Sequence, residues 1–395
     1  MTEADPAQDQ PDRSRPSVAT VLREWGRIGC VGFGGPPTHI RLLRELCVDR
    51  KRWIGAVEFE DAIAACNLLP GPASTQLSIF CAWRVRGGLG ALVGGLAFIV
   101  PGLVVILALA ALFLGTPPLW VLAAGAGAGA AVPAVAVHAA AGLLPASWQR
   151  AHMAGRARTV RWAAYLIAGI VATATIGAWV VLVLIACGAV ELTARVPREN
   201  RTAVLPLPML ASGAVSVGVL SSVAWVAFKV GALSYGGGFV IIPLMQADAV
   251  DRYHWMTSGQ FLNAVALGQI TPGPVVQTVA VVGYAAAGLT GGLLASAVAF
   301  GPSFALILLG ARHFDQLRAN ASARAFLDGA GPAAVGAIGG SAISLARAMT
   351  EPWQYLVLAS AFIVLFVLRR GVVPTLLLAA AAGVLITAAG LALPH

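Results

Sequence analysis

The chain has 395 residues, of which 58% are hydrophobic and only 11% are charged, and its mean hydropathy is +0.82. This composition excludes an ordinary soluble protein and predicts an all-α polytopic membrane protein. The net charge of +9 is typical of cytoplasmic loops enriched in Lys and Arg, so we expect a lipid bilayer as the partner and no nucleic acid.

Several chemical classes have no sequence signature here. The five cysteines form no C-x-x-C pair and are interpreted as free thiols, so no metal site is predicted. The sequence contains no H-E-x-x-H, no G-x-S-x-G and no Walker A lysine. We therefore expect neither an enzyme nor a cofactor, and any pumping must draw on an ion gradient. No signal peptide is predicted, and residues 1–17 are interpreted as a disordered tail.

The rest of the chain divides into two similar halves. Residue n set beside residue n + 202 aligns Gly29–Phe98 with Gly231–Phe300 without a gap. The informative matches are Gly34 with Gly236, Gly35 with Gly237, Asp49 with Asp251, Arg50 with Arg252, Trp53 with Trp255, Phe59 with Phe261, and Pro-Gly-Pro at 70–72 and 272–274. The pattern predicts two homologous repeats, residues 18–194 and 211–395, joined by a cytoplasmic linker, residues 195–210.

Each half is predicted to begin with a helix that ends at a glycine break. These helices cover about 18–33 and 212–235, and a short helix follows at 56–69 or 258–271. Pro-Gly-Pro then separates it from a second short helix that ends near residue 84 or 286. Helices of 12–15 residues do not cross about 30 Å of hydrocarbon, which favours broken or re-entrant helices at both motifs.

The remaining apolar segments are long enough for further spans. They are predicted at 89–114, 119–144, 160–194 (as two short helices about Gly177), 289–312, 325–346, 355–368 and 372–391.

The positive charges predict opposite orientations for the two halves. The first half carries Arg41, Arg44, Arg50, Lys51 and Arg52 where the second retains Arg252 alone. In a later loop the bias reverses: Leu114 to Pro118 is uncharged, whereas Arg312, Arg318 and Arg324 occupy the matching part of the second half. By the positive-inside rule, this reversal indicates an inverted-topology repeat.

The two Pro-Gly-Pro breaks are the leading candidates for a binding site. They could be kinks that only allow close packing. Small polar residues beside both breaks favour instead a midplane cavity in which helix N-termini attract an anion. The candidate binding residues are Asn67, Pro70, Gly71, Pro72, Thr75, Gln76, Gln269, Thr271, Pro272, Gly273, Pro274, Gln277 and Thr278.

Glycines and cations near the first helix of each half extend this candidate site. Gly34 and Gly35, with Gly236 and Gly237, permit close backbone approach to a ligand or to another helix. Arg27 and Lys229 occupy equivalent positions seven residues before these glycines. Snorkelling to the interface would explain both cations, but an anion-attracting role is the preferred interpretation.

Acidic residues before the first break are candidates for proton coupling. Glu58 and Asp61 precede the first Pro-Gly-Pro, and their counterparts Gln260 and Asn263 are uncharged. A solvated interfacial acid is the alternative for Asp61. His138 is a lone histidine within a predicted span.

These residues together resemble the chromate ion transporter family, over nearly the whole chain after the tail. The resemblance rests on Phe33-Gly-Gly-Pro36, Trp53, Asn67-Leu-Leu-Pro-Gly-Pro72 with Thr75-Gln76, Ser234-Tyr-Gly-Gly-Gly238, Trp255 and Gln269-Ile-Thr-Pro-Gly-Pro274. It implies a long, two-domain transporter that exports chromate across the bacterial inner (plasma) membrane and confers chromate resistance. The resemblance further implies a proton-driven antiporter, with sulfate as an isosteric competitor. The second glycine motif departs from the first, so the two breaks are expected to be unequal.

Two alternatives remain open at this level. One is an importer or exchanger of sulfate or another inorganic anion; the other is a membrane-embedded enzyme or scaffold. A homodimer is a further possibility.

Overall fold

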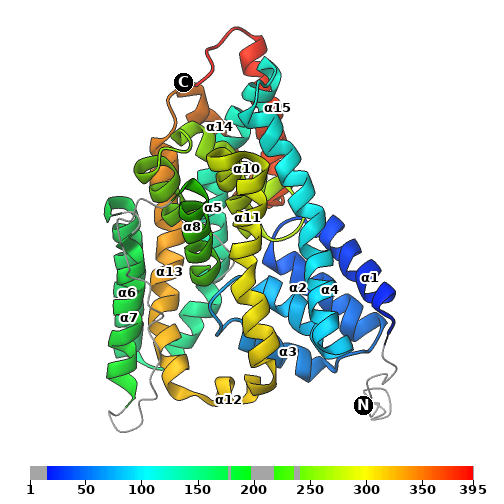
Figure 1. Ribbon diagram of the computed structural model, residues 1–395. Coiled ribbons are helices and arrows are strands. Elements are labelled where there is room, and N and C mark those ends of the chain that lie inside the picture. The colour runs from blue at the N-terminus through cyan, green and yellow to red at the C-terminus, as the bar shows by residue number, and fades with distance from the viewer. Residues whose placement is uncertain (1–15, 177–178, 197–217, 235–240, 395) are drawn as a thin grey trace.

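The computed structural model describes residues 16–176, 179–196, 218–234 and 241–394, and this part of the chain is helical, with no strand (Figure 1). Within these residues, four segments are long and apolar enough to cross a membrane: Ala73–Leu114, Leu119–Met153, Val275–His313 and Ala321–Arg347. The all-α polytopic class predicted from composition is therefore confirmed. Most of the predicted tail and most of the predicted linker lie outside the described residues.

The first half comprises helices α1 to α7. Their bounds are α1 Val18–Val31, α2 Pro36–Arg44, a π-helical turn Glu45–Arg50, α3 Ala56–Cys66, α4 Ala73–Leu114, α5 Leu119–Met153, α6 Arg156–Ile176 and α7 Val180–Arg195. Ser17 caps α1 by accepting a hydrogen bond from the Thr20 N–H. The predicted division of residues 160–194 into two helices is confirmed, although Gly177 itself lies outside the described part.

The second half comprises helices α8 to α15. Their bounds are α8 Val219–Leu233, α9 Ile242–Gln246, a π-helical turn Ala247–Arg252, α10 Ser258–Ile270, a 3₁₀ turn Val275–Gln277, α11 Thr278–Gly310, a 3₁₀ turn Ala311–His313, α12 Phe314–Ala319, α13 Ala321–Arg347, α14 Pro352–Phe362, a π-helical turn Ile363–Val367 and α15 Val372–Ala388.

Unusual backbone geometry recurs between the halves. The π-helical turns Glu45–Arg50 and Ala247–Arg252 are 202 residues apart. Two residues beyond them, Arg52 and His254 adopt left-handed φ values of 47° and 52°. These conformations are uncommon for residues with a side chain. Their recurrence at one spacing agrees with the sequence matches.

The spacing changes inside the long helices. α4 is kinked at Arg86–Gly87 and α11 at Ala287–Gly288, so these kinks are 201 residues apart. The second half is therefore one residue shorter than the first between the π-helical turn and the kink, so an ungapped alignment is out of register at the kinks and beyond them. After the kink, Gly102 corresponds to Ser303, and each of them follows a proline within its helix.

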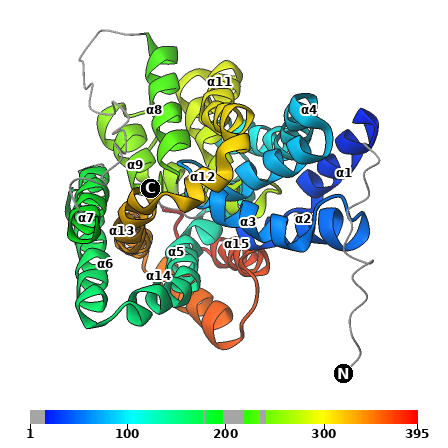
Figure 2. The same cartoon turned by 90° about the horizontal axis from the view of Figure 1, so that it is seen from below.

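The two halves exchange packing partners. α5 packs against α14 and α15, whereas α13 packs against α6 and α7, and α4 contacts α11 between them. In Figure 1 α6 and α7 flank α13, far from α1 to α4, and Figure 2 shows the same separation from below. The core is therefore shared between the halves.

Helix boundaries at the Pro-Gly-Pro motifs differ from those predicted. α3 ends at Cys66 rather than Leu69, and a 3₁₀ turn rather than an α-helix follows Pro274. The predicted helix breaks are present at both motifs. The predicted ends near residues 84 and 286 also agree with the structure, because Arg86–Gly87 and Ala287–Gly288 have non-helical φ and ψ. Each of α4 and α11 therefore consists of two helical segments that meet at a kink, where Gly87 and Gly288 adopt positive φ without steric cost.

Candidate functional site

The first Pro-Gly-Pro break turns the chain directly into α4. Gly71 has a φ of 118°, which favours glycine, and Pro72 is the residue before the first helical turn. The Thr75 and Gln76 N–H groups donate to the Pro72 carbonyl at 2.9 and 3.0 Å. The Gln76 Nε2 donates to the Pro70 carbonyl at 2.6 Å. The turn thus places two polar side chains on the buried start of α4.

The second break has the same turn but different side-chain bonds. Gly273 has a φ of 89°. The Thr271 hydroxyl donates to Leu267 and the Thr278 hydroxyl to Val275, both at 2.9 Å. The Gln277 Nε2 donates to the Ile99 carbonyl of α4 at 2.6 Å, which links the two halves.

Each break packs against helices of the other half. The Gly273 N–H donates to the Gly32 carbonyl, at the end of α1, at 3.0 Å. A Cβ placed on Gly71 would lie 3.2 Å from the Ser303 Oγ and 3.4 Å from the Gly231 carbonyl oxygen. Each break is therefore held at the contact between the halves.

Buried polar atoms without hydrogen-bond partners cluster around this region. Among the described residues they include the hydroxyls of Thr75, Ser78, Ser234 and Ser303, the Gln269 Nε2 and the Oε1 atoms of Gln76 and Gln277. Buried polar groups are nearly always paired, because an unpaired group retains its desolvation cost. The hydroxyls and the Gln269 amide can donate to an oxyanion, and the two Oε1 atoms can accept from water or a protonated ligand.

His39 is a member of this region that the sequence analysis missed. Its side chain is fully buried. The Nε2 atom lies 2.9 Å from the Gly32 carbonyl oxygen, and the Nδ1 atom lies 3.3 Å from the Ser74 Oγ. Ser74 lies in the first turn of α4, and the same Gly32 carbonyl accepts from Gly273. His39 thus joins the surroundings of both breaks. The residue at the matching position of the second half is Ile241. Because the sequence analysis relied on residues that both halves share, it could not identify His39.

Other predicted site residues lie elsewhere. Asn67 is exposed, and exposed Arg27 lines a surface pocket with Glu24, Glu45 and Arg50. Gly35 is buried beside the Val275 side chain, whereas Gly34 is exposed. Gly236 and Gly237 lie outside the described residues.

Lys229 is held by an acid that the sequence analysis did not connect with it. Its Nζ lies 2.5 Å from the buried Asp248 carboxylate and 5.8 Å from the centre of the Trp225 ring. Asp248 occupies the repeat position of Leu46, so the repeat comparison gave no indication of the pair. An anion attracted by Lys229 would have to compete with this carboxylate.

The predicted coupling acids lie on α3. Glu58 forms an ion pair with Arg84, and Asp61 is partly buried. His138 lies in α5, where its ring meets Phe366 edge-on with 5.3 Å between ring centres.

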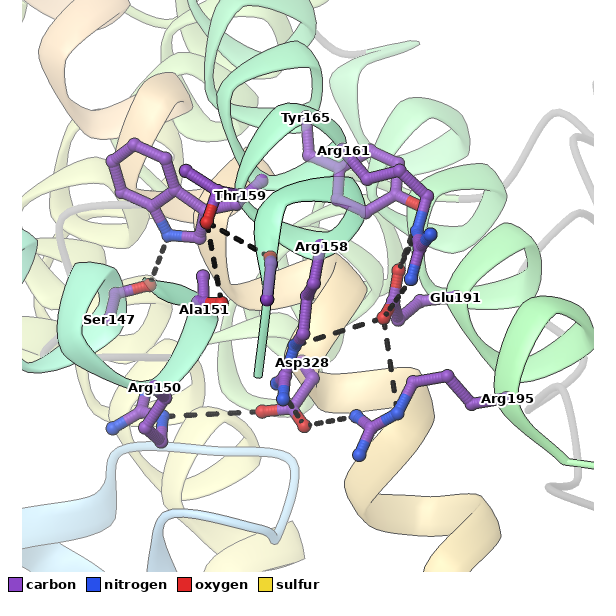
Figure 3. Close-up of polar contacts among 12 residues, drawn as sticks. Ser147, Arg150, Ala151, Arg158, Thr159, Arg161, Tyr165, Glu191, Arg195 and Asp328 are labelled. Atoms are coloured by element: carbon purple, nitrogen blue, oxygen red, sulfur yellow. Dashed lines mark hydrogen bonds and ion pairs between the residues drawn. The ribbon is translucent and has the colours of Figure 1, made fainter. Parts of the chain in front are cut away.

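A separate charged cluster fastens α6 and α7 to α13 (Figure 3). Arg158 and Arg195 contact the Asp328 carboxylate at 2.5 and 2.6 Å, and Arg161 makes two bonds to Glu191 at 2.7 and 3.0 Å. Glu191 also accepts from the Tyr165 hydroxyl at 3.1 Å. Because Arg158 and Arg195 of the first half pair with Asp328 of the second, the cluster holds α6 and α7 against α13.

The comparisons with known proteins identify the family of this chain. The family described as Chromate transporter matches residues 19–192 and 221–386. A chromate transport protein of Cupriavidus metallidurans is 34% identical over 81% of this chain and 80% of its own length. A chromate transport protein of Pseudomonas aeruginosa is 31% identical over 85% and 82%. A probable chromate transport protein of Synechococcus elongatus is 29% identical over 84% and 85%.

No solved structure matches the chain. The matched segments include both Pro-Gly-Pro breaks and the helices that pack around them. The chain belongs to the chromate transporter family and is a membrane-embedded transporter.

Proposed function

We propose that this chain exports chromate across the bacterial inner membrane in a proton-coupled cycle and so confers chromate resistance. The anion binds between the two Pro-Gly-Pro breaks, among the polar groups of Thr75, Gln76, Gln269 and Gln277. The observation that carries the proposal is the set of buried, unpartnered polar atoms at this contact between halves. The names of the family and of its relatives support chromate as the anion.

The chemistry of the region suits a tetrahedral oxyanion. Hydroxyl and amide donors bind oxygen atoms without a fixed countercharge, so the anion can also be released. The start of α4 contributes N–H groups and the positive end of its helix dipole. Chromate and sulfate share shape and charge, and hydrogen bonding alone discriminates them weakly, so sulfate should compete.

The proposed inverted orientation of the halves supports alternating access. The exchanged packing of α5 and α13 allows the two breaks to rock against a shared frame. Asp61 and Glu58 remain the acids to test for proton coupling, although the ion pair between Glu58 and Arg84 makes Asp61 the better candidate.

Transport assays test this proposal directly. Inside-out vesicles from cells that express the chain should accumulate labelled chromate when energised, excess sulfate should reduce the uptake, and intact cells should grow at higher chromate concentrations. Vesicles that carry a Thr75→Val, Gln269→Leu double variant serve as the control with equal protein content. If intact cells that express the chain accumulate more chromate, export is rejected in favour of the alternative, an anion importer or exchanger.

Failure of purified protein in liposomes to move any oxyanion would favour an enzyme or scaffold instead. The same preparation, analysed by light scattering, would test the possible homodimer.

A further inference from the structure

His39 is a buried titratable group that lies between the elements of the proposed anion site. It is on α2, packs against α1 and α4, and its ring meets Phe98 edge-on with 5.0 Å between ring centres. The Gly32 carbonyl can only accept, so the His39 Nε2 carries a proton. In a neutral ring the Nδ1 then accepts from the Ser74 hydroxyl. One protonation site, Nδ1, therefore remains available next to the first turn of α4.

No ionised side chain compensates a charge on this ring in the described part of the chain. The ionisable residues on the elements packed against it are Arg23, Glu24, Arg27 and Cys30 of α1, Glu45, Cys47, Asp49 and Arg50 of the π-helical turn, and Cys81, Arg84 and Arg86 of α4. None of them interacts with the ring, whose contacts are the Gly32 carbonyl, the Ser74 hydroxyl and Phe98. On its own helix, Arg41 and Arg44 are exposed. Burial without a countercharge opposes the imidazolium form.

A bound oxyanion would supply the missing countercharge. We propose that His39 is the proton-binding site of the transporter and that the proton and the oxyanion bind together, each raising the affinity for the other. The inference rests on the proposed function, because it requires the anion to bind at the breaks. It assigns the coupling to a residue other than Asp61 or Glu58.

Both hydrogen bonds of the His39 ring, to the Gly32 carbonyl and to the Ser74 hydroxyl, can be kept when the ring is protonated. When Nδ1 takes a proton from a hydronium ion, one O–H bond breaks and water leaves, one N–H bond forms, and the positive charge passes to the ring. Nδ1 then donates to the Ser74 Oγ, whose own hydroxyl hydrogen is freed from the ring. That hydrogen can rotate and donate to an oxygen of the anion. Protonation thus adds both a charge and a donor at the start of α4.

In this mechanism the proton moves in the same direction as the anion, whereas in an exchanger the two move in opposite directions. A dianion accompanied by one proton carries a net charge of −1, which an interior-negative membrane potential drives outward. Export then depends on the membrane potential, and the pH gradient acts against it. An exchange of chromate for protons would instead be accelerated by the pH gradient.

Proton uptake on anion binding tests the inference. Calorimetric titration of purified protein with sulfate in two buffers of different ionisation enthalpy gives the number of protons taken up. We expect up to one proton per anion in the wild type, and an affinity that rises by as much as tenfold for each unit that the pH is lowered. His39→Gln and His39→Asn should bind sulfate with no uptake and little pH dependence. For titrations with chromate, the proton uptake of each variant is subtracted from that of the wild type. This difference cancels the contribution from protonation of the anion itself.

Matched variants separate the possible results. His138→Gln should retain the uptake of the wild type. Unchanged uptake in a folded His39 variant, or its loss in Asp61→Asn alone, overturns the inference. If neither His39 variant folds, the wild type decides: anion binding without proton uptake overturns it. Absence of oxyanion binding and flux in the wild type would instead reject the proposed function.

Discussion

The Gly273 N–H donates to the Gly32 carbonyl oxygen at 3.0 Å, so the break of the second half is fastened to the first helix of the first half. His39 donates to the same oxygen at 2.9 Å. This one carbonyl therefore connects a helix break, a helix end and a titratable ring. Contacts across the halves should consequently be the ones most sensitive to substitution.

Gly102 provides the sharpest steric test. A Cβ at Gly102 would lie 2.1 Å from the Pro272 carbonyl oxygen, and that oxygen belongs to rigid backbone. We expect Gly102→Ala to destabilise the protein by about 1–3 kcal/mol and to abolish transport. Thermal unfolding in detergent and vesicle uptake would measure both. Gly301→Ala is the matched control, because no heavy atom lies within 4 Å of its Cβ; equal stability of the two variants would contradict this packing.

The glutamines at the breaks test the binding proposal. Gln277→Leu leaves the Ile99 carbonyl without the Gln277 donor, at a cost of about 1–3 kcal/mol in stability, and removes a polar group from the region. Gln76→Leu does the same at the first break. Both should raise the KM for chromate uptake at least tenfold, on the scale of a lost charge-assisted bond. Asn67→Ala, at an exposed position, should leave the KM unchanged, and a larger effect there would place the site elsewhere.

The Lys229–Asp248 pair separates an anion-binding role from a structural one. Lys229→Ala strands the buried Asp248 carboxylate, which should cost about 3–5 kcal/mol of stability. Replacing both residues, as Lys229→Met with Asp248→Leu, removes the stranded charge and should recover most of that loss. Thermal unfolding gives the stabilities, and chromate uptake by the folded double variant gives the role. Normal affinity in that variant would remove Lys229 from the anion site, whereas a selective loss of affinity would keep it there.

Asp328 should act as a fastener between the halves. Asp328→Asn removes the countercharge of Arg158 and Arg195, so these cations repel and the contact of α13 with α6 and α7 weakens. Because Arg158 and Asp328 are largely buried, we expect a loss on the order of 1–3 kcal/mol. Protease sensitivity near Arg156 reports the loosening. Arg347→Gln on the same helix, whose guanidinium donates an exposed hydrogen bond to the Ala174 carbonyl, should show no such effect.

Local sequence patterns predicted the positions of the helices well. They did not predict contacts between residues that are distant in the sequence. Pro-Gly-Pro dictates a helix break through its missing N–H groups and its glycine, so residues 70–72 and 272–274 could be located from sequence alone. The helix ends near residues 84 and 286 could also be located, but the positive φ of Gly87 and Gly288 could not, since a glycine in a helical pattern does not reveal the sign of its φ. His39 was missed because its partners, Gly32 and Ser74, are brought to it only by tertiary folding.

Charge patterns had the same limitation. They identified Arg27 and Lys229 as equivalent in sequence, yet one lies on the surface and the other faces Asp248, because Leu46 and Asp248 differ at the matching position. The same backbone turns recur in both halves, while single residue differences change the electrostatics.

The exchanged packing of α5 and α13 has a consequence for how the protein comes into being. α5 is covered by α14 and α15, and α13 by α6 and α7, so either half alone would expose the face that the other half is built to cover. Neither half is therefore expected to fold completely by itself. The smallest unit that folds is a pair of halves, and two separately synthesised halves would have to find each other in the membrane before either reached its final shape.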